Sequence, residues 1–239
     1  MLANCTVTSA QFGTLSGEVQ KPTTFRLELL DFIFNELPRW RDRPDRPIVT
    51  AETALTSQLC AHLNSAVRHS DGWDILQFRV EEPDEKNSGR KIDLVASSSG
   101  TAICIEGRRH TDFDSLMPIE CKRLPIPSDK RRDEREYVIS QYSSTGGIQR
   151  FKAGHHGAIH TFGAMIAYIQ QDTRVSWNTR IAEWIKALSA TGTIGWSQSD
   201  QLQLIKDDTS LRLAVLRSSH TRDNNLPAIE LRHLWISMK

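Results

Sequence analysis

The sequence predicts an α/β fold, in which helices flank a central β-sheet. Apolar residues recur at helical spacing over 25–37, 50–67 and 175–188. Runs with the alternation and composition of strands lie between these stretches. One run, 163–170, is almost continuously apolar, which is typical of a central strand. Helices and strands that interleave in this way give the α/β class.

The composition is that of an ordinary globular protein. The chain has 239 residues, 38% of them hydrophobic and 25% charged, which is enough for one sizeable core. No internal repeat or low-complexity segment is present, so we predict a single domain over 21–239, preceded by a flexible arm over 1–20. The net charge of +1 gives no global basic excess, so binding to a polyanion would depend on local patches.

The cysteines and the lack of long apolar runs predict a cytoplasmic protein. Cys5, Cys60, Cys104 and Cys121 are scattered singly, which argues against a zinc site and for a reducing compartment. The N-terminal stretch lacks the basic start and the long apolar run of a signal peptide. No segment approaches the roughly 18 apolar residues of a membrane span, so we expect no membrane association.

Two helices are predicted in the first third of the chain. Apolar residues recur every three or four positions over 25–37, and Pro38 is expected to end this helix. A basic, proline-containing turn at 39–47 links it to a second helix over 50–67, which carries one apolar residue per turn. Glu52 lies in the first turn of the second helix, where the helix dipole favours an acid.

Strand-like runs separated by turns follow the second helix. They lie at 73–80, 91–96, 101–106 and 117–124. Their order along the chain predicts an antiparallel meander. After them a glycine turn is expected to lead into a helix that ends at Gly154. Closing strands are predicted at 202–205, 211–216 and 229–236.

The segment Glu120-Cys121-Lys122 lies in one of these strands. Residues two apart share a face of a strand, so it carries an acid and a base side by side. Charged side chains are rarely buried unless they are paired or bound to metal. A plain ion pair on an edge strand is the simplest interpretation. Asp93, inside the preceding run 91–96, adds a second carboxylate and favours a functional site.

The residues that could take part in catalysis follow one another in a recognisable order. They are a helix with Glu52, a strand with Asp93, a strand with Glu120 and Lys122, and a helix with Gln149 and Arg150. This order resembles the PD-(D/E)xK nuclease superfamily, particularly bacterial members, over roughly 50–170. The resemblance implies a restriction-endonuclease-like core, with a central mixed β-sheet flanked by helices. It also implies a Mg²⁺- or Mn²⁺-dependent endonuclease.

The resemblance assigns roles to the acids and to the lysine. Asp93, Glu120 and Glu52 would be metal ligands, together with the backbone carbonyl of Cys121. Mg²⁺ prefers such oxygen ligands, and acids on adjacent strands, about 4.8 Å apart, can share one ion. Lys122 would orient the attacking water or stabilise charge in the transition state.

Polar residues downstream are predicted to contact the nucleic acid. Gln149 resembles a glutamine that lies near the site in parts of the superfamily and would contact a phosphate or the attacking water. The predicted phosphate-binding residues are Lys130, Arg131, Arg132, Arg135, Arg150 and Lys152. Contacts of this kind make affinity depend on salt concentration.

The sequence departs from the family pattern in two respects. Ile92 stands where the pattern has proline before Asp93. Asp93 and Glu120 are 27 positions apart, with another strand-like run between them. Using Glu106 as the second acid would put Arg108 in the place of the lysine, and arginine cannot easily play that part.

Other catalytic patterns fit the sequence less well. His155, His156 and His160 lie close together, but Gly157 follows His156, so the HExxH pattern of a zinc protease is absent. A structural or surface role is therefore favoured for these histidines. There is also no GxSxG motif of a serine hydrolase.

We therefore predict a Mg²⁺-dependent nuclease, with DNA as the favoured substrate. A role in restriction or anti-phage defence follows from the resemblance alone. The sequence carries no helicase or ATPase motif, so any motor or activator would be a separate chain, and cutting both strands of a duplex would suit a homodimer. The alternatives are a nucleic-acid- or protein-binding module with a degenerate site, and a purely structural Glu120–Lys122 ion pair.

Overall fold

A computed structural model describes residues 18–86, 89–127, 132–142, 146–193, 195–222 and 225–239. Its centre is a seven-stranded sheet in the order β2-β3-β6-β7-β10-β9-β8. In that order the strands are Leu76–Pro83, Lys91–Ser98, Met117–Leu124, Phe162–Ile169, Ile229–Ser237, Leu213–His220 and Gln203–Asp208. β7 pairs in parallel with both β6 and β10, and the other neighbours are antiparallel, so the sheet is mixed.

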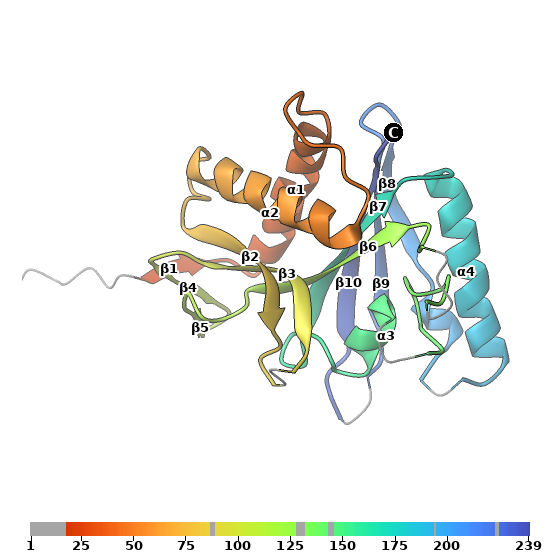
Figure 1. Ribbon diagram of the computed structural model, residues 1–239. Helices are drawn as coiled ribbons and strands as arrows, with labels where there is room; N and C mark the ends of the chain where they lie inside the picture. The colour runs from red at the N-terminus through yellow and green to blue at the C-terminus, as the bar shows by residue number, and fades with distance from the viewer. Residues whose placement is uncertain (1–17, 87–88, 128–131, 143–145, 194, 223–224) are drawn as a thin grey trace, which may run out of the picture.

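Helices cover both faces of this sheet (Figure 1). α1 (Phe25–Arg41) and α2 (Glu52–Arg68) pack on one face, and α3 (Gly147–Lys152) and α4 (Arg174–Ala190) pack on the other. A short 3₁₀ helix, Gln198–Asp200, follows α4. The predicted α/β class with a central sheet is confirmed. In the described part of the chain, no helix is long and apolar enough to cross a membrane.

β7 shows why the apolar run near the middle of the chain forms a central strand. Ala164, Ile166 and Tyr168 belong to the core under α1 and α2. Met165 and Ala167, which alternate with them, belong to the core under α4. Because successive side chains point to opposite faces, a strand covered on both sides is apolar at every position.

The predicted meander is wrong at the third strand. β4 (Ala102–Ile105) leaves the main sheet and pairs with β1 (Glu18–Lys21) and β5 (Arg108–His110) in a separate three-stranded sheet. Residues 18–20, which were expected in a flexible arm, therefore belong to a strand, while 1–17 lie outside the described residues. The insert between β3 and β6 thus folds away and leaves those two strands adjacent.

Several element boundaries also differ from the prediction, and two of these differences have a clear physical cause. Pro38 lies inside α1, which continues to Arg41. The guanidinium of Arg41 is buried and donates to the carbonyls of Leu211 at 2.9 Å and Ser237 at 3.2 Å. These tertiary contacts hold the last turn in spite of the hydrogen bond that proline cannot make. β2 begins later than expected because Trp73 stacks on helix α1 instead of extending the strand.

Candidate active site

The candidate site lies where β3 and β6 separate. These strands pair at only three positions, which are Ala96↔Met117, Val95↔Pro118 and Leu94↔Ile119. Asp93 and Glu120 come directly after the last pair and therefore face one another. Leu94 and Ile119 pack in the core under α1 and α2, so alternation puts the two acids on the same opposite face. The 27 positions between the acids do not separate them in space.

The sheet is irregular on the other side of Asp93 as well. β2 pairs with β3 at Val80↔Leu94 and Glu82↔Ile92, and Asp93 has no registered partner between them. Glu81, at the corresponding place in β2, has a φ of 52°, which is uncommon for a residue with a side chain. Backbone in such a conformation is often found beside functional sites.

Carboxylates replace the missing strand partner of β6. The backbone N–H of Cys121 donates to Asp93 Oδ2 at 2.8 Å, and that of Arg123 donates to Glu52 Oε2 at 2.8 Å. Glu52 reaches this position because it opens α2, whose N-terminus points into the gap. The N–H and C=O of one strand residue point to the same side, so the carbonyl of Cys121 also faces the gap.

Lys122 brings the three acids together. Its side chain is 4% exposed, and Nζ lies 2.7 Å from Glu120 Oε1, 3.4 Å from Glu52 Oε1 and 3.8 Å from Asp93 Oδ2. The structure thus gathers four of the predicted site residues, which come from α2, β3 and β6. A buried ammonium is stable here because each acid offsets part of its desolvation.

The pKa values of the cluster diverge. Burial and, to a smaller extent, the neighbouring Glu120 charge together raise the pKa of Asp93 to about 7 against the opposing effect of Lys122. Burial also acts to raise the pKa of Glu120, but Lys122, His156 and Arg150 outweigh it and hold that pKa well below its usual range. The pKa of Lys122 is raised, because the acids outweigh the effect of its burial. Divergent pKa values in one cluster are typical of functional sites.

Two residues that hold Glu120 were not predicted to do so. Arg150 Nη1, in α3, lies 2.7 Å from Glu120 Oε1, so the predicted phosphate contact is already paired in this structure. His156 Nδ1 lies 3.0 Å from Glu120 Oε2 and is buried, although the pair lacks the direction of a hydrogen bond. No spacing motif connects either residue to Glu120, so these two contacts could not be predicted from the sequence.

Gln149 has a local role in the structure. Its side-chain oxygen accepts hydrogen bonds from the backbone N–H of Ser140 at 3.1 Å and of Gly146 at 3.3 Å. The oxygen is thus engaged in fixing the preceding loop to α3 instead of pointing freely toward the acids. A helix start offers orphan N–H groups, and a glutamine three residues on satisfies one of them.

The remaining predicted phosphate contacts divide into three groups. Lys152 is 5% exposed and pairs with Asp200 at 2.5 Å, so its ammonium is already engaged within the protein. Arg132 and Arg135 pair with neighbouring acids in the segment after β6 but remain partly exposed. Lys130 and Arg131 lie outside the described residues.

A buried chain of hydrogen bonds anchors this side of the sheet. Asp200 Oδ1 lies 2.6 Å from His220 Nδ1, and His220 Nε2 lies 2.6 Å from Ser218 Oγ. Ser218 Oγ in turn lies 2.8 Å from His233 Nε2, whose Nδ1 lies 2.8 Å from the hydroxyl of Tyr137. The first three residues have the contacts of a hydrolase triad, but all are buried, so Ser218 has no access to a substrate.

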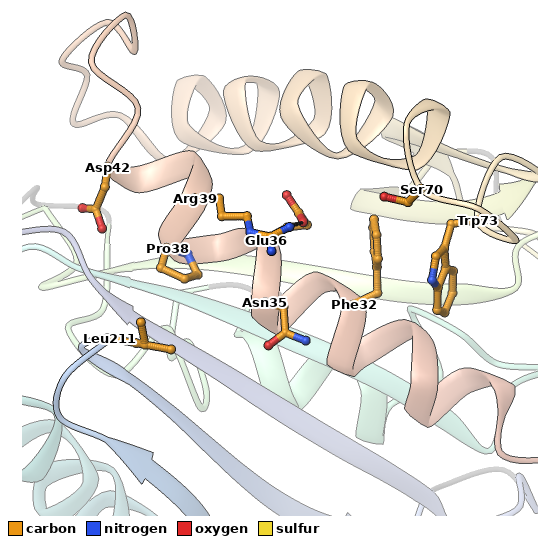
Figure 2. Close-up of a pocket in the computed structure, with 9 residues that line it drawn as sticks. All are labelled: Phe32, Asn35, Glu36, Pro38, Arg39, Asp42, Ser70, Trp73 and Leu211. Atoms are coloured by element: carbon orange, nitrogen blue, oxygen red, sulfur yellow. Dashed lines mark hydrogen bonds and ion pairs between the residues drawn. The ribbon is translucent and has the colours of Figure 1, made fainter.

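A pocket opens beside the acids. It has a volume of about 310 Å³ and is lined by the first turn of α2, by Glu81 and by Asp93. A second pocket, of about 610 Å³, is lined mainly by α1, together with Ser70, Trp73 and Leu211 (Figure 2). Its buried acid, Glu36, is paired with Arg39 at 2.6 Å and with His62 at 2.9 Å. That carboxylate is already neutralised and does not belong to the cluster around Lys122.

The rival acid lies elsewhere. Glu106 occupies the turn between β4 and β5, its side chain is 54% exposed, and it lies 3.7 Å from Arg26. The choice of Glu120 over Glu106 as the partner of Asp93 therefore agrees with the structure.

The oxygen donors of the cluster suit a hard divalent cation, although in this structure the ammonium of Lys122 lies among them. Within the described ranges, no three His, Cys, Asp or Glu side chains are arranged to hold a metal ion. Two acids and a carbonyl nevertheless face the same gap, and Glu120 Oε2 is buried without a hydrogen-bond partner. The raised pKa of Asp93 also indicates a carboxylate that lacks a full complement of positive charge. Oxygen donors of this kind are those that Mg²⁺ and Mn²⁺ prefer.

Comparisons with known proteins identify no family for this chain. No protein-family model matches it, and no curated protein or solved structure matches it. The resemblance to the PD-(D/E)xK superfamily therefore rests on the residues and their arrangement.

Proposed function

We propose that this protein is a metal-dependent nuclease that hydrolyses phosphodiester bonds, with DNA as the favoured substrate. One observation carries the proposal: Asp93 and Glu120 face one another where β3 and β6 separate, with Lys122 between the acids. The identity of the acids, their strands and the following lysine agree with the chemistry that phosphodiester hydrolysis requires.

Each residue of the cluster has a defined part in this proposal. Asp93, Glu120 and the Cys121 carbonyl would hold the cation, with Glu52 at the edge of the site. A divalent cation, when bound, supplies Lewis acidity toward a phosphoryl oxygen. Lys122 places a positive charge where negative charge develops during hydrolysis. Arg150 and His156 orient Glu120 from the side of α3.

The nuclease proposal is tested by cleavage of DNA with matched acid-to-amide variants. We expect the wild-type protein to cut single-stranded or duplex DNA with Mg²⁺ or Mn²⁺. Asp93→Asn should lower the rate at least about 100-fold, a loss of the size seen when a key electrostatic group is removed. Glu106→Gln, an exposed acid of the rival motif, should retain full activity.

Loss of activity in Asp93→Asn counts only if the variant is folded, which circular dichroism can check. Equal activity of Asp93→Asn and the wild type would refute the proposal. So would the absence of cleavage of linear, circular, single- and double-stranded DNA and RNA with either metal. A defence role and a separate motor or activator chain remain part of the proposal and depend on cleavage being found first.

A nucleic-acid-binding module without catalysis is the second candidate. It is favoured by the burial of Glu120, whose Oε1 already contacts both Lys122 and Arg150. A module of this kind should bind nucleic acid equally well in Mg²⁺ and in EDTA, and Asp93→Asn should not change its affinity. The nuclease should instead show metal-dependent turnover that Asp93→Asn removes.

A further inference from the structure

A groove of about 980 Å³ lies between the segment that follows β6 and helix α4. In Figure 1 this segment runs beside α4, on the side of the sheet that carries α3. The groove begins at Pro125, three residues after Lys122 along the chain. At a rise of about 3.3 Å per strand residue, Pro125 lies about 10 Å along the backbone from Lys122.

One wall of the groove presents guanidinium groups that pair with buried acids, and the exposed acid Glu134 also lines it. Arg135 binds Asp133 through Nε at 3.0 Å and Nη2 at 2.9 Å, and Arg132 Nε donates to Glu136 at 2.7 Å. The side chains of both arginines are 31% exposed, whereas those of Asp133 and Glu136 are 3% and 10% exposed. The acids therefore fix the guanidiniums in place, and arginine retains further N–H donors for a phosphate.

The groove also contains aromatic side chains. Tyr142 is 57% exposed, and Trp184 on α4 is partly exposed. Arg180, the third arginine that lines the groove, has its guanidinium 4.9 Å from the ring centroid of Trp177. Exposed rings next to arginines are the combination that binds unpaired bases by stacking and their phosphates by charge.

We propose that this groove binds a single-stranded segment of nucleic acid and leads it to the acid cluster. The bases of a duplex are stacked on one another, so rings such as Tyr142 and Trp184 can stack only on an unpaired base. The guanidiniums of Arg132, Arg135 and Arg180 contact the phosphates. This inference rests on the proposed nuclease function and names the form of its substrate.

The test measures the binding of a fluorescein-labelled oligothymidine of about 12 nucleotides, a length within the usual site size. Binding is followed by fluorescence anisotropy in EDTA with Asp93→Asn as the background, so that cleavage does not consume the probe. Tyr142→Ala and Trp184→Leu should each weaken binding about tenfold. Arg180→Gln should lower the slope of log affinity against log salt by about 0.7.

Matched controls separate this proposal from general loss of affinity. Phe113→Ala removes a ring that is 90% exposed outside the groove and should leave binding unchanged. Affinity for a duplex of the same length should change less than twofold in every ring variant. Unchanged single-strand affinity in Tyr142→Ala and Trp184→Leu, or an equal loss for the duplex, would overturn the proposal. A polyglutamate peptide that competes as well as oligothymidine would also overturn it, in favour of a protein partner.

The groove proposal and the nuclease proposal can be refuted independently of one another. If the wild type cleaves DNA but the ring variants bind oligothymidine normally, the groove proposal is wrong and the nuclease stands. If the ring variants lose binding but the wild type cleaves nothing, the nuclease is wrong and the groove stands.

Discussion

Asp93 and Glu120 are two carboxylates in one cluster with opposite electrostatic environments. Glu120 is fully buried and contacts Lys122 and Arg150 directly, so its ionised form is stabilised. Asp93 lies 3.8 Å from the same ammonium, and its side chain keeps 27% of its exposure. The ammonium compensates this carboxylate less, so burial and the charge of Glu120 disfavour the ionised form of Asp93. The same change, from acid to amide, should consequently have opposite effects on stability at the two positions.

Asp93→Asn is expected to stabilise the protein above neutral pH. Because the folded pKa is raised to about 7, the folded state binds more protons than the unfolded state from about pH 4 upward, and stability falls as pH rises to 7. The variant should gain about 1–2 kcal/mol at pH 8, or about 2–8 °C in Tm, and much less at pH 4. Thermal unfolding at both pH values, with Glu106→Gln as a control, measures this. A lower Tm than wild type at pH 8 would contradict it.

Glu120→Gln is expected to destabilise the protein strongly. The change leaves the ammonium of Lys122 and the guanidinium of Arg150 without their closest anion in a buried place. Breaking a buried pair in this way costs about 3–5 kcal/mol. Urea unfolding at pH 7 provides the measurement. A stability within about 1 kcal/mol of wild type would mean that Glu120 is not the anion that balances this cluster.

At the scale of elements, α3 is the connection between the site and the rest of the sheet. Arg150 on this short helix contacts Glu120, while Lys152 points into the core and pairs with Asp200. Asp200 is the end of the buried hydrogen-bond chain through His220, and the chain ties α3 to β9 and β10. The sequence shows that Arg150 and Lys152 are both cations after a glycine turn. It does not show that one faces the site and the other the core, because that depends on how a six-residue helix is rotated.

The buried chain predicts opposite tautomers for two histidines. Asp200 accepts a hydrogen bond from the Nδ1–H of His220, so Nε2 of His220 accepts one from the Ser218 hydroxyl, and Ser218 Oγ accepts one from the Nε2–H of His233. Burial lowers the pKa of both imidazoles from the ordinary value of about 6.5, so both are expected to be neutral at pH 7.5. Their contribution to stability is then present above about pH 6.5 and is lost as pH falls below it. Nitrogen chemical shifts of the imidazoles at pH 7.5 test this, and a charged form of either ring, or the same tautomer in both, would contradict it.

At the scale of the whole molecule, local patterns predicted the layers and the long-range pairings required the structure. β7 was predictable because a strand covered on both faces is apolar throughout, and β6 because its charged residues alternate with apolar ones. The departure of β4 from the main sheet was not predictable, because its partner β1 lies more than 80 residues earlier in the chain. Asp93, Glu120, Lys122 and Glu52 were predicted together on residue type and order. Their common location depends on this departure of β4, which leaves β3 beside β6.

The side-chain contacts that the sequence did not predict share one cause. His156 and Arg150 approach Glu120, Gln149 turns to its own loop, and Lys152 is buried, all in the segment around α3. Short elements carry too few residues for a clear hydrophobic period, so the direction of each side chain is set by packing against distant parts of the chain.

Titration with Mn²⁺ by calorimetry tests most directly whether the cluster around Lys122 is a cation site. At pH 7 an Asp93 with a pKa of about 7 is about half protonated, so binding should release about half a proton. The heat should therefore differ between two buffers of different ionisation enthalpy. We predict buffer-dependent Mn²⁺ binding for the wild type and for Glu106→Gln, and none for Asp93→Asn. Absence of binding to the wild type, or equal binding to Asp93→Asn, would contradict the account.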